Sequence, residues 1–392
     1  MKQLYEKVLT GRFVTRPNRF VVHLAMDHLD GEVVAAHLPN PGRMWELLYP
    51  NVKFYVVHHP KAGAKTQYRV IGIERDGVPI MLDTNYSNDV AEYLISTKQI
   101  PGWEQWGVVR REYTVGQSRF DLLLTNDKGA SFLLEVKSCT LFSRHGAMFP
   151  DAITERGRKH LLHLQHLQSE GYHTGVLFLV QWEYAQWFLP DYHTDLAFAQ
   201  TFAEVAGDLD WKAIALRWTA EFTMPTVIRE CYYEKALVEQ EGQDRGDYLV
   251  VLQLPETREL DIGSKGPMHF EAGYYTYVGS AKANLSKRLE RHKRKRKKLH
   301  WHLDYFRSHC DIIATVPIRS SADLECELAK AMKQLDTWEV KGFGCSDCDC
   351  TSHLFGTSYN PIHNKDFMDM VEDFRMNRLD ARFEIREGFI EP

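Results

Sequence analysis

The spacing of apolar residues changes twice along this chain of 392 residues, and that change limits the fold more than any other feature. Early in the chain, short runs of β-branched and aromatic residues alternate with Gly, Pro, Asp or Asn, which predicts five strands. Five short strands in that length predict a small β-barrel of the OB type. The five runs are residues 19–27, 31–39, 52–60, 66–75 and 78–85.

From about residue 84 the pattern becomes mixed, with helical and strand-like segments in alternation. This order indicates an α/β domain built around one sheet. A short helix is also expected to begin at Met44 in the segment MWELL. The expected helices are residues 87–97 and 154–171, and the expected strands are 110–116, 119–125, 131–138 and 175–181.

A polar, charged stretch, VEQEGQDRG at residues 238–246, lacks apolar periodicity and predicts a boundary. It follows a helix-like stretch at 209–222 and precedes a strand-like one at 248–254. We therefore expect an OB-like barrel in 1–82 and an α/β domain in 83–236. A linker at 237–246 would lead to an α+β domain in 247–392 that ends in a helical tail.

Positive charge is concentrated in residues 287–298, KRLERHKRKRKK, where nine Lys and Arg face one Glu. The local charge of +8 leaves −13 for the remainder of a chain whose net charge is −5. Such a block favours contact with phosphates, although a solvated helix face is the alternative. No apolar run approaches a membrane span, and the charged N-terminus does not resemble a signal peptide. Seven cysteines, an odd number, indicate no disulfide framework and favour a reducing cytoplasm.

Two carboxylates and an ammonium group are expected to meet on one hairpin. The turn signal NDKG at 126–129 separates two strand patterns, and a turn centred near Lys128 pairs residues whose numbers add to 256. Asp121 then lies opposite Glu135, and Lys137 shares their face. Acidic oxygens near a backbone carbonyl favour Mg²⁺ or Mn²⁺, and such a metal site suits phosphodiester hydrolysis. A surface hairpin with a cross-strand salt bridge is the alternative.

This D…ExK hairpin resembles the core of PD-(D/E)xK nucleases. More specifically, residues 1 to about 235 resemble the sugar fermentation stimulation protein family through HLPNPGRMWELL, RFDLLL, FLLEVKSCTL and FPDAITERGRKHLLHL. The resemblance implies an OB-like domain, a restriction-endonuclease-like domain, DNA binding and a role in transcription of sugar-use genes. It assigns the nuclease triad to Asp121, Glu135 and Lys137.

Basic residues near the hairpin are candidates for phosphate contact. Thr154 is expected to cap the helix that carries most of them, so that backbone donors point the same way. Glu92, on the preceding helix, is either a further acid of the site or a plain surface residue. The candidate contacts are Arg156, Arg158, Lys159 and His160 on the helix and Arg43 in the barrel, with Arg16 and Arg19 as weaker candidates.

A second nuclease-like pattern follows the linker. Gly246, Tyr248, Tyr277 and Gly279 match the GIY-YIG signature, and residues 245–356 resemble an uncharacterised domain family related to these nucleases. The resemblance makes Tyr248, Tyr277 and Arg288 catalytic and Glu325 a ligand for Mg²⁺ or Mn²⁺. Asp247 departs from the classical pattern. The basic segment adds Arg291, Arg294 and Arg296 as further nucleic-acid contacts.

Cysteine and histidine form a cluster near the end of this domain. Cys345, Cys348, Cys350 and His353 offer thiolate and imidazole ligands that suit Zn²⁺, and reduced structural cysteines are the alternative. His300, His302 and Asp304 alternate as they would on one face of a strand.

Together these patterns predict a cytoplasmic DNA-binding protein with a metal-dependent phosphodiesterase site and a second nuclease-like nucleic-acid-binding module. The alternative is a non-catalytic DNA-binding regulator, and a protein-interaction scaffold is a third class. No membrane contact and no small-molecule cofactor is expected. The choice of DNA or RNA, the strandedness of the substrate and the oligomeric state stay open.

Overall fold

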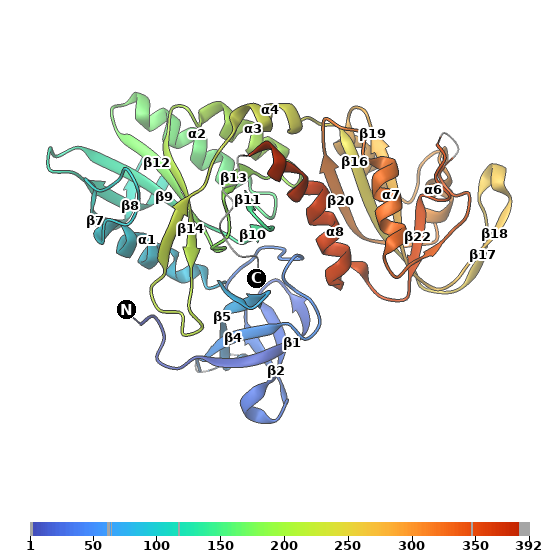
Figure 1. Cartoon of the computed structure of the whole chain (residues 1–392), viewed down its shortest axis with the longest axis horizontal. Coiled ribbons are helices and arrows are strands. Elements are labelled where there is room, and N and C mark those ends of the chain that lie inside the picture. The colour runs from blue at the N-terminus through green and yellow to red at the C-terminus, as the bar shows by residue number, and fades with distance from the viewer. Residues whose placement is uncertain (1–2, 61–62, 64, 117, 346–347, 384–392) are drawn as a thin grey trace. The chain divides into compact units, whose positions relative to one another are not determined.

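The computed structural model describes residues 3–60, 63, 65–116, 118–345 and 348–383, which form two compact units (Figure 1). The first unit runs to Val238 and takes up the chain again from Leu379, and the second spans Glu239–Arg378. The boundary between the units, after Val238, falls inside the predicted linker, although helix α4 (Lys235–Glu241) and the start of strand β16 (Gly246–Leu254) extend into that segment. Of the residues expected in the last domain, Leu379–Phe383 belong to the first unit.

The OB-like barrel is confirmed, but it has six strands in the order β3-β2-β1-β4-β5-β6. An additional β3–β5 pairing links strands that are not neighbours in that order. The strand missed by sequence reasoning is β1, because charged residues interrupt its apolar positions and only Gly11 and Phe13 are buried. The strands are β1 (Leu9–Asn18), β2 (Val21–Met26), β3 (Val33–His37), β4 (Lys53–His58), β5 (Tyr68–Arg75) and β6 (Val78–Met81). The expected helix at MWELL is a turn.

The α/β domain is confirmed as a six-stranded mixed sheet in the order β15-β14-β12-β9-β8-β7. Central strand β12 runs parallel to both β9 and β14. Its strands are β7 (Gly107–Val115), β8 (Ser118–Thr125), β9 (Ser131–Cys139), β12 (His173–Val180), β14 (Asp210–Arg217) and β15 (Thr226–Glu230). Its helices are α1 (Ser87–Ser96), α2 (Glu155–Ser169) and α3 (Leu196–Val205). A small side sheet adds β10 (Leu141–Phe142), β11 (Gly146–Phe149) and β13 (Trp187–Pro190).

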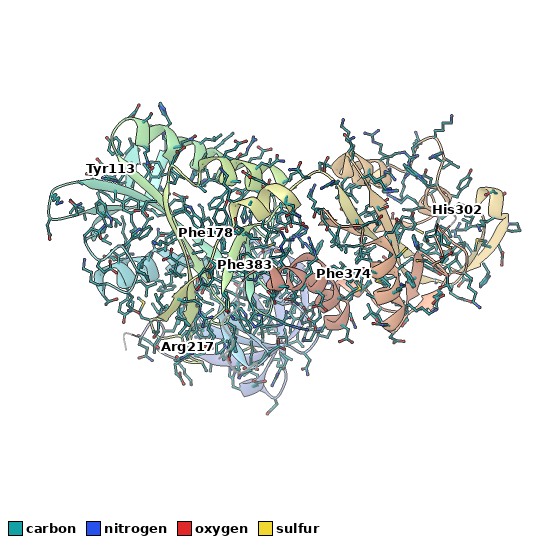
Figure 2. The ribbon with its side chains drawn as sticks, turned by 45° about the horizontal axis from the view of Figure 1, so that its top comes forward. Tyr113, Phe178, Arg217, His302, Phe374 and Phe383 are labelled. Atoms are coloured by element: carbon teal, nitrogen blue, oxygen red, sulfur yellow. The ribbon has the colours of Figure 1, made fainter. Side chains whose placement is uncertain are left out.

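Helices cover both faces of this sheet (Figure 1). Alternate residues of β12 enter different apolar clusters, because successive strand side chains point to opposite faces. Phe178 belongs to the same apolar cluster as Leu164 of α2 and Phe198 of α3, whereas Leu177 belongs to a second cluster with Leu94 of α1. Figure 2 places Phe178 among the packed side chains of this unit.

The segment 209–222, expected to be helical, contains strand β14. Ala213 to Leu216 are all buried, so neither face carries the polar residues that mark an exposed strand. A buried apolar run cannot be told from a helix by periodicity alone.

The second unit has a five-stranded sheet in the order β20-β16-β19-β22-β21 and a separate hairpin, β17–β18. The remaining strands are β17 (Arg258–Asp261), β18 (Pro267–Phe270), β19 (Gly273–Ala281), β20 (Asp311–Arg319), β21 (Trp338–Glu339) and β22 (Leu354–Thr357). Its helices are α5 (Leu285–Lys293), α6 (His302–Arg307), α7 (Glu325–Gln334) and α8 (Lys365–Arg375). Helix α8 lies in the segment expected to form a helical tail, and it packs on β20 and α7.

The described residues also form the 3-10 helices η1 (Asp27–Leu29), η2 (Thr84–Tyr86), η3 (Gly263–Lys265), η4 (Pro361–His363) and η5 (Asn377–Arg382). The strand expected through His300, His302 and Asp304 is wrong, because helix α6 begins at His302. Asp304 accepts hydrogen bonds from the backbone N–H groups of His300 and Trp301, which caps that helix. Across the described residues, no helix has the length and apolar character needed to cross a membrane.

Candidate functional site

The first site lies where strands β8 and β9 separate. Their ladder pairs Leu122 with Leu134 and Leu123 with Leu133, so the predicted register, in which pairs add to 256, is confirmed. The backbone ladder ends at Leu122. At Asp121, the residue before it, the side chain rather than the backbone bonds to strand β9. Its Oδ2 accepts a hydrogen bond of 2.8 Å from the backbone N–H of Val136. This bond holds the Asp121 carboxylate beside Glu135.

Asn88, on helix α1, is a site residue that sequence reasoning missed. Its Nδ2 donates to Asp121 Oδ1 at 3.2 Å, so both Asp121 oxygens have a fixed partner. In the sequence, only the helical spacing of the apolar residues in α1 could have suggested that Asn88 faces the sheet. Burial raises the pKa of Asp121, and the negative charge of Glu135 raises it further. The site therefore disfavours two bare carboxylates without a compensating cation.

Glu135 lies on β9 and is only 4% exposed. Its Oε1 accepts from Lys137 Nζ at 2.5 Å and lies 2.7 Å from His160 Nδ1 on α2. Burial acts to raise the pKa of Glu135, but His160 and the Lys137 ammonium outweigh it and hold that pKa below its ordinary value. Oε2 is buried and has no hydrogen-bond partner among the described residues. Glu135 is thus an ionised carboxylate with one oxygen left for a further partner.

The predicted phosphate contacts on α2 divide into two groups. Thr154 caps the helix, as predicted, by accepting from the N–H of Gly157 at 3.0 Å. Arg156, Arg158 and Lys159 are exposed, whereas His160 turns inward to Glu135. His160 was predicted to contact nucleic acid, but its ring is engaged with the carboxylate.

Two other candidates from the sequence have protein partners. Glu92 pairs with Arg111 on β7, which agrees with the plain surface alternative. The Arg43 guanidinium donates to the Asp151 carbonyl and to Thr194 Oγ1 and lies 4.5 Å from the centre of the Trp45 ring. Arg43 therefore joins the barrel to the α/β domain inside the first unit.

The second candidate site gathers side chains from strands β16 and β19 and helices α5 and α7. Tyr248 lies opposite Gly279 in the β16–β19 ladder, and a side chain at Gly279 would collide with its ring. Tyr248 and Tyr277 have ring centres 6.4 Å apart. Burial raises the pKa of Tyr248, and the Arg288 charge opposes that rise. The structure thus brings together Tyr248, Tyr277 and Arg288, and their catalytic roles stay predictions.

Sequence reasoning missed His292, one turn after Arg288 on helix α5. Its Nε2 lies 2.9 Å from the Tyr248 hydroxyl. Burial lowers the pKa of His292 to about 3, with the Lys297 charge acting the same way. The imidazole is therefore neutral and can accept the Tyr248 proton in a hydrogen bond. Only the amphipathic spacing of α5 pointed His292 toward the sheet.

The side chains of the basic segment, residues 287–298, also fall into two groups: some are held in internal ion pairs and others face solvent. Arg291 makes two hydrogen bonds to Asp304, of 2.9 and 2.8 Å, and lies 4.2 Å from the centre of the Trp301 ring. Lys297 approaches Asp304 at 2.8 Å. Arg294 and Arg296 are exposed. Of the predicted nucleic-acid contacts, Arg291 is therefore held in an internal ion-pair network, and Arg294 and Arg296 face solvent.

Asp247 supports a prediction about pH. Burial raises its pKa to about 7, although its carboxylate accepts from the Leu324 N–H at 3.1 Å. Between about pH 4 and pH 7, Asp247 is therefore protonated in the folded state but ionised in the unfolded chain. Because the folded state binds the extra proton, the free energy of unfolding falls as pH rises through this range.

Asp247→Asn should remove this loss of stability at high pH, because an amide does not titrate. Its oxygen can still accept the hydrogen bond from the Leu324 N–H. We expect the variant to melt above the wild type at pH 8 and close to it at pH 5, as measured by scanning calorimetry. The exposed Asp261→Asn is the control. An equal melting difference at both pH values would contradict the assignment.

Part of the predicted cysteine cluster is present. Cys348, Cys350 and His353 lie together, and their fourth companion is Cys326 of α7, with all four ligand atoms within 4.8 Å of one another. Among the described residues, Cys345 is not part of this group. The sequence prediction thus named Cys345 where the structure has Cys326. Cys326 lies 22 positions before Cys348, and no local pattern marks it.

The first unit therefore combines an OB-like barrel with a restriction-endonuclease-like core, in which two acids and a lysine meet where strands β8 and β9 separate. Residues 14–82 match a family model described as the SfsA N-terminal OB domain, and residues 85–221 match the sugar fermentation stimulation protein RE domain. The chain belongs to the sugar fermentation stimulation protein family. It carries in addition, at residues 247–376, a match to a domain of unknown function, DUF123.

Relatives of known family match about half of the chain. The sugar fermentation stimulation protein homolog of Methanosphaera stadtmanae is 39% identical over 204 residues, which span 51% of this chain and 84% of that protein. The homolog of Methanothermobacter thermautotrophicus is 34% identical and spans 56% of this chain and 97% of that protein. A solved structure of Pyrococcus furiosus SfsA in complex with Ca²⁺ aligns with a TM-score of 0.53 at 28% identity, covering 60% of this chain and 99% of that one.

Proposed function

We propose that the first unit is a divalent-metal-dependent phosphodiesterase that acts on DNA, with its reaction centre at Asp121, Glu135 and Lys137. The observation that carries this proposal is the state of Glu135. One of its oxygens is held by Lys137 and His160, and the other is buried without a hydrogen-bond partner among the described residues. An ionised oxygen left unsatisfied in the interior is costly, and a cation is a partner that would remove this cost.

The donor set fits Mg²⁺ or Mn²⁺. Glu135 Oε2 and the remaining lone pairs of Asp121 are hard oxygen ligands. The carbonyl of Val136 leaves β9 on the same side as its N–H, which faces Asp121, so a backbone oxygen is available beside them. When bound, such a metal lowers the pKa of water and neutralises charge on the phosphate.

The protein residues supply position and charge. Asn88 and the Val136 N–H fix Asp121, while His160 fixes Glu135 from helix α2. The Lys137 ammonium lies at the same carboxylate, where it can stabilise negative charge on a phosphate or orient the attacking water. A contact surface alone would gain nothing from two acids, because they repel phosphate unless a cation joins them.

Further support comes from the relatives. The Pyrococcus furiosus SfsA structure is described in complex with Ca²⁺, a hard divalent cation with the same preference for oxygen ligands as Mg²⁺. The role in sugar fermentation in the family name is compatible with the alternative proposal, a DNA-binding regulator of sugar-use genes that cuts nothing. The DUF123-matching unit would then be a second nucleic-acid-binding module in either case, with Arg294 and Arg296 facing solvent.

The exposed cations of α2 give a prediction about salt. Each phosphate contact to duplex DNA contributes about 0.9 to the slope of log K against log salt concentration. Replacing Arg158 and Lys159 together by Ala should weaken duplex binding and reduce that slope by about 1 to 2, as measured by fluorescence anisotropy. Lys128→Ala, at the exposed turn of the β8–β9 hairpin, is the matched control. An unchanged slope would exclude these two side chains from the interface.

The proposal as a whole is tested by cleavage of end-labelled single- and double-stranded DNA and RNA. Each substrate is incubated with the full chain in Mg²⁺, Mn²⁺ or EDTA. We expect products from DNA with either metal and none with EDTA. Binding without cleavage under every condition would contradict the enzyme proposal and favour the regulator.

A further inference from the structure

We propose that Cys326, Cys348, Cys350 and His353 bind one structural Zn²⁺ in the second unit, and that Glu325 orients His353 as a ligand of that metal. The site is separate from the Asp121 and Glu135 centre and does not depend on the function proposed above. Three sulfur atoms and one imidazole nitrogen form a ligand set found in structural zinc sites. Thiolates also favour Zn²⁺ over Mg²⁺ or Ca²⁺, which prefer oxygen.

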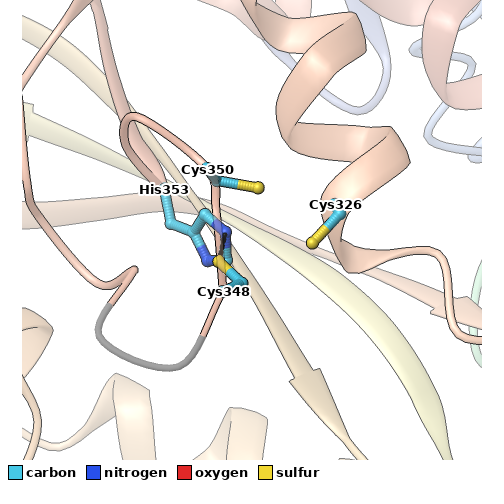
Figure 3. Close-up of side chains that lie close together, drawn as sticks. All are labelled: Cys326, Cys348, Cys350 and His353. Atoms are coloured by element: carbon cyan, nitrogen blue, oxygen red, sulfur yellow. Dashed lines mark hydrogen bonds between the residues drawn. The ribbon is translucent and has the colours of Figure 1, made fainter.

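The geometry agrees with four-coordinate zinc. With bonds of about 2.3 Å to sulfur and about 2.0 Å to nitrogen, the ligand atoms of a tetrahedral site lie about 3.5–3.8 Å apart. The Cys348 Sγ lies 3.4 Å from His353 Nε2, and all four ligand atoms lie within 4.8 Å of one another. Figure 3 shows the Cys326 side chain reaching from its helix toward the loop that carries the other three. Small rotations of the side chains would close the set around one ion.

The ligands come from segments that the fold already holds. Cys326 is in the first turn of helix α7. His353 is fixed by its backbone, because its N–H donates to the Phe343 carbonyl and its carbonyl accepts from Val278 of strand β19. Cys348 and Cys350 lie in the loop that precedes strand β22 and have no regular structure of their own. A metal at this point would tie that loop to α7 across 22 residues of chain.

Glu325 provides the second observation. The His353 ring is buried, with 1% exposure, and its Nε2 faces Cys348. Its Nδ1, on the other side of the ring, lies 3.3 Å from Glu325 Oε1. Histidine ligands of zinc commonly place their second ring nitrogen against a carboxylate, which sets the tautomer and the orientation of the ring. This arrangement fits Nε2 as the metal ligand.

The same contacts assign Glu325 a different task from the one its place in the GIY-YIG pattern implies. Its Oε2 accepts from Ser280 Oγ at 2.6 Å, and its Oε1 lies 3.3 Å from His353 Nδ1. Glu325 is therefore a positioning residue that joins the cysteine cluster to strand β19, which also carries Tyr277. Loss of zinc should loosen this end of the second candidate site.

A disulfide is the main alternative for the cysteines, and metal analysis separates the two. The full chain is produced with added zinc, purified without chelator and analysed by mass spectrometry of the metal. We expect about one zinc per chain. Cys326→Ser and Cys350→Ser should both lose it, whereas Cys345→Ser, a change in the same loop region outside the group, should keep it.

Replacement of zinc by Co²⁺ gives an independent readout of thiolate ligation. The wild-type and Cys345→Ser chains should show the absorption of a tetrahedral cobalt–thiolate site, and this absorption should be lost in Cys326→Ser. A wild-type chain without zinc and without this spectrum would overturn the proposal. Loss of zinc in Cys345→Ser but not in Cys326→Ser would overturn the ligand set.

The role of Glu325 has its own test. Glu325→Ala should weaken zinc binding by about tenfold to a hundredfold, measured by competition with a chromogenic chelator, because His353 loses the group that orients it. Asp323→Ala, an exposed acid two residues earlier, should leave the affinity unchanged. Equal affinities for wild type and Glu325→Ala would show that Glu325 does not position the ligand.

Discussion

Asp121→Asn should lower metal-dependent cleavage of DNA by about a hundredfold or more while leaving the fold intact. The amide keeps the shape of the side chain, and its oxygen can still accept from the Val136 N–H. What it loses is the negative charge that would hold a cation beside Glu135. Removal of one group that stabilises charge in a reaction centre commonly costs two to three orders of magnitude in rate.

The matched control is Glu92→Gln. Glu92 is an acid of the same domain, on the same helix as Asn88, but it pairs with Arg111 at the surface. Its variant should cleave as the wild type does. Melting temperatures of both variants check that neither change unfolds the first unit. Full activity of Asp121→Asn, or an equal loss in Glu92→Gln, would place the chemistry elsewhere in the chain.

Asp304→Ala should destabilise the second unit by about 3 kcal/mol or more. The Asp304 side chain is buried and accepts from Arg291 and Lys297 and from the N–H groups of His300 and Trp301. Removal of one partner from a buried ion pair typically costs about 3–5 kcal/mol, because the remaining charges lose their compensation. The cap of helix α6 is lost at the same time.

The effect has a predictable pH dependence. Burial acts to raise the pKa of Asp304, but hydrogen bonds from Arg291 and Lys297 outweigh it and hold that pKa well below its ordinary value. Its stabilisation is therefore complete above pH 4, where the unfolded chain is ionised, and is lost as pH falls below that. Calorimetric melting of wild type and variant should thus differ strongly at pH 7 and less at pH 3.

Asp311→Asn provides the comparison for this second prediction. Asp311 also pairs with a lysine of the basic segment, Lys295 at 2.8 Å, but both side chains are exposed. Exposed ion pairs add little to stability, so this variant should have the same melting temperature as the wild type. If Asp304→Ala also melted with the wild type, the basic segment would be a solvated surface rather than a part of the core.

Local sequence patterns determined the strands and the register that form part of each candidate site. The turn at 126–129 and the apolar alternation around it were enough to set the register that brings Asp121 to Glu135, because a hairpin pairs neighbours in the chain. The resemblance of Gly246, Tyr248, Tyr277 and Gly279 to the GIY-YIG signature predicted two strands in the second unit, and the structure pairs them in one antiparallel ladder. The first case is a hairpin closed by one short turn, and the second is a single antiparallel ladder.

Only the tertiary structure decided which distant side chains meet. Asn88 reaches Asp121 from α1, His160 reaches Glu135 from α2, and Cys326 joins Cys348 from α7. No periodicity encodes these contacts, since each depends on how a helix packs on a sheet. The same cause hid strand β14, whose two buried faces erased the alternation that would have marked it. Sequence patterns were therefore reliable for neighbours in the chain and silent about the packing that completes each site.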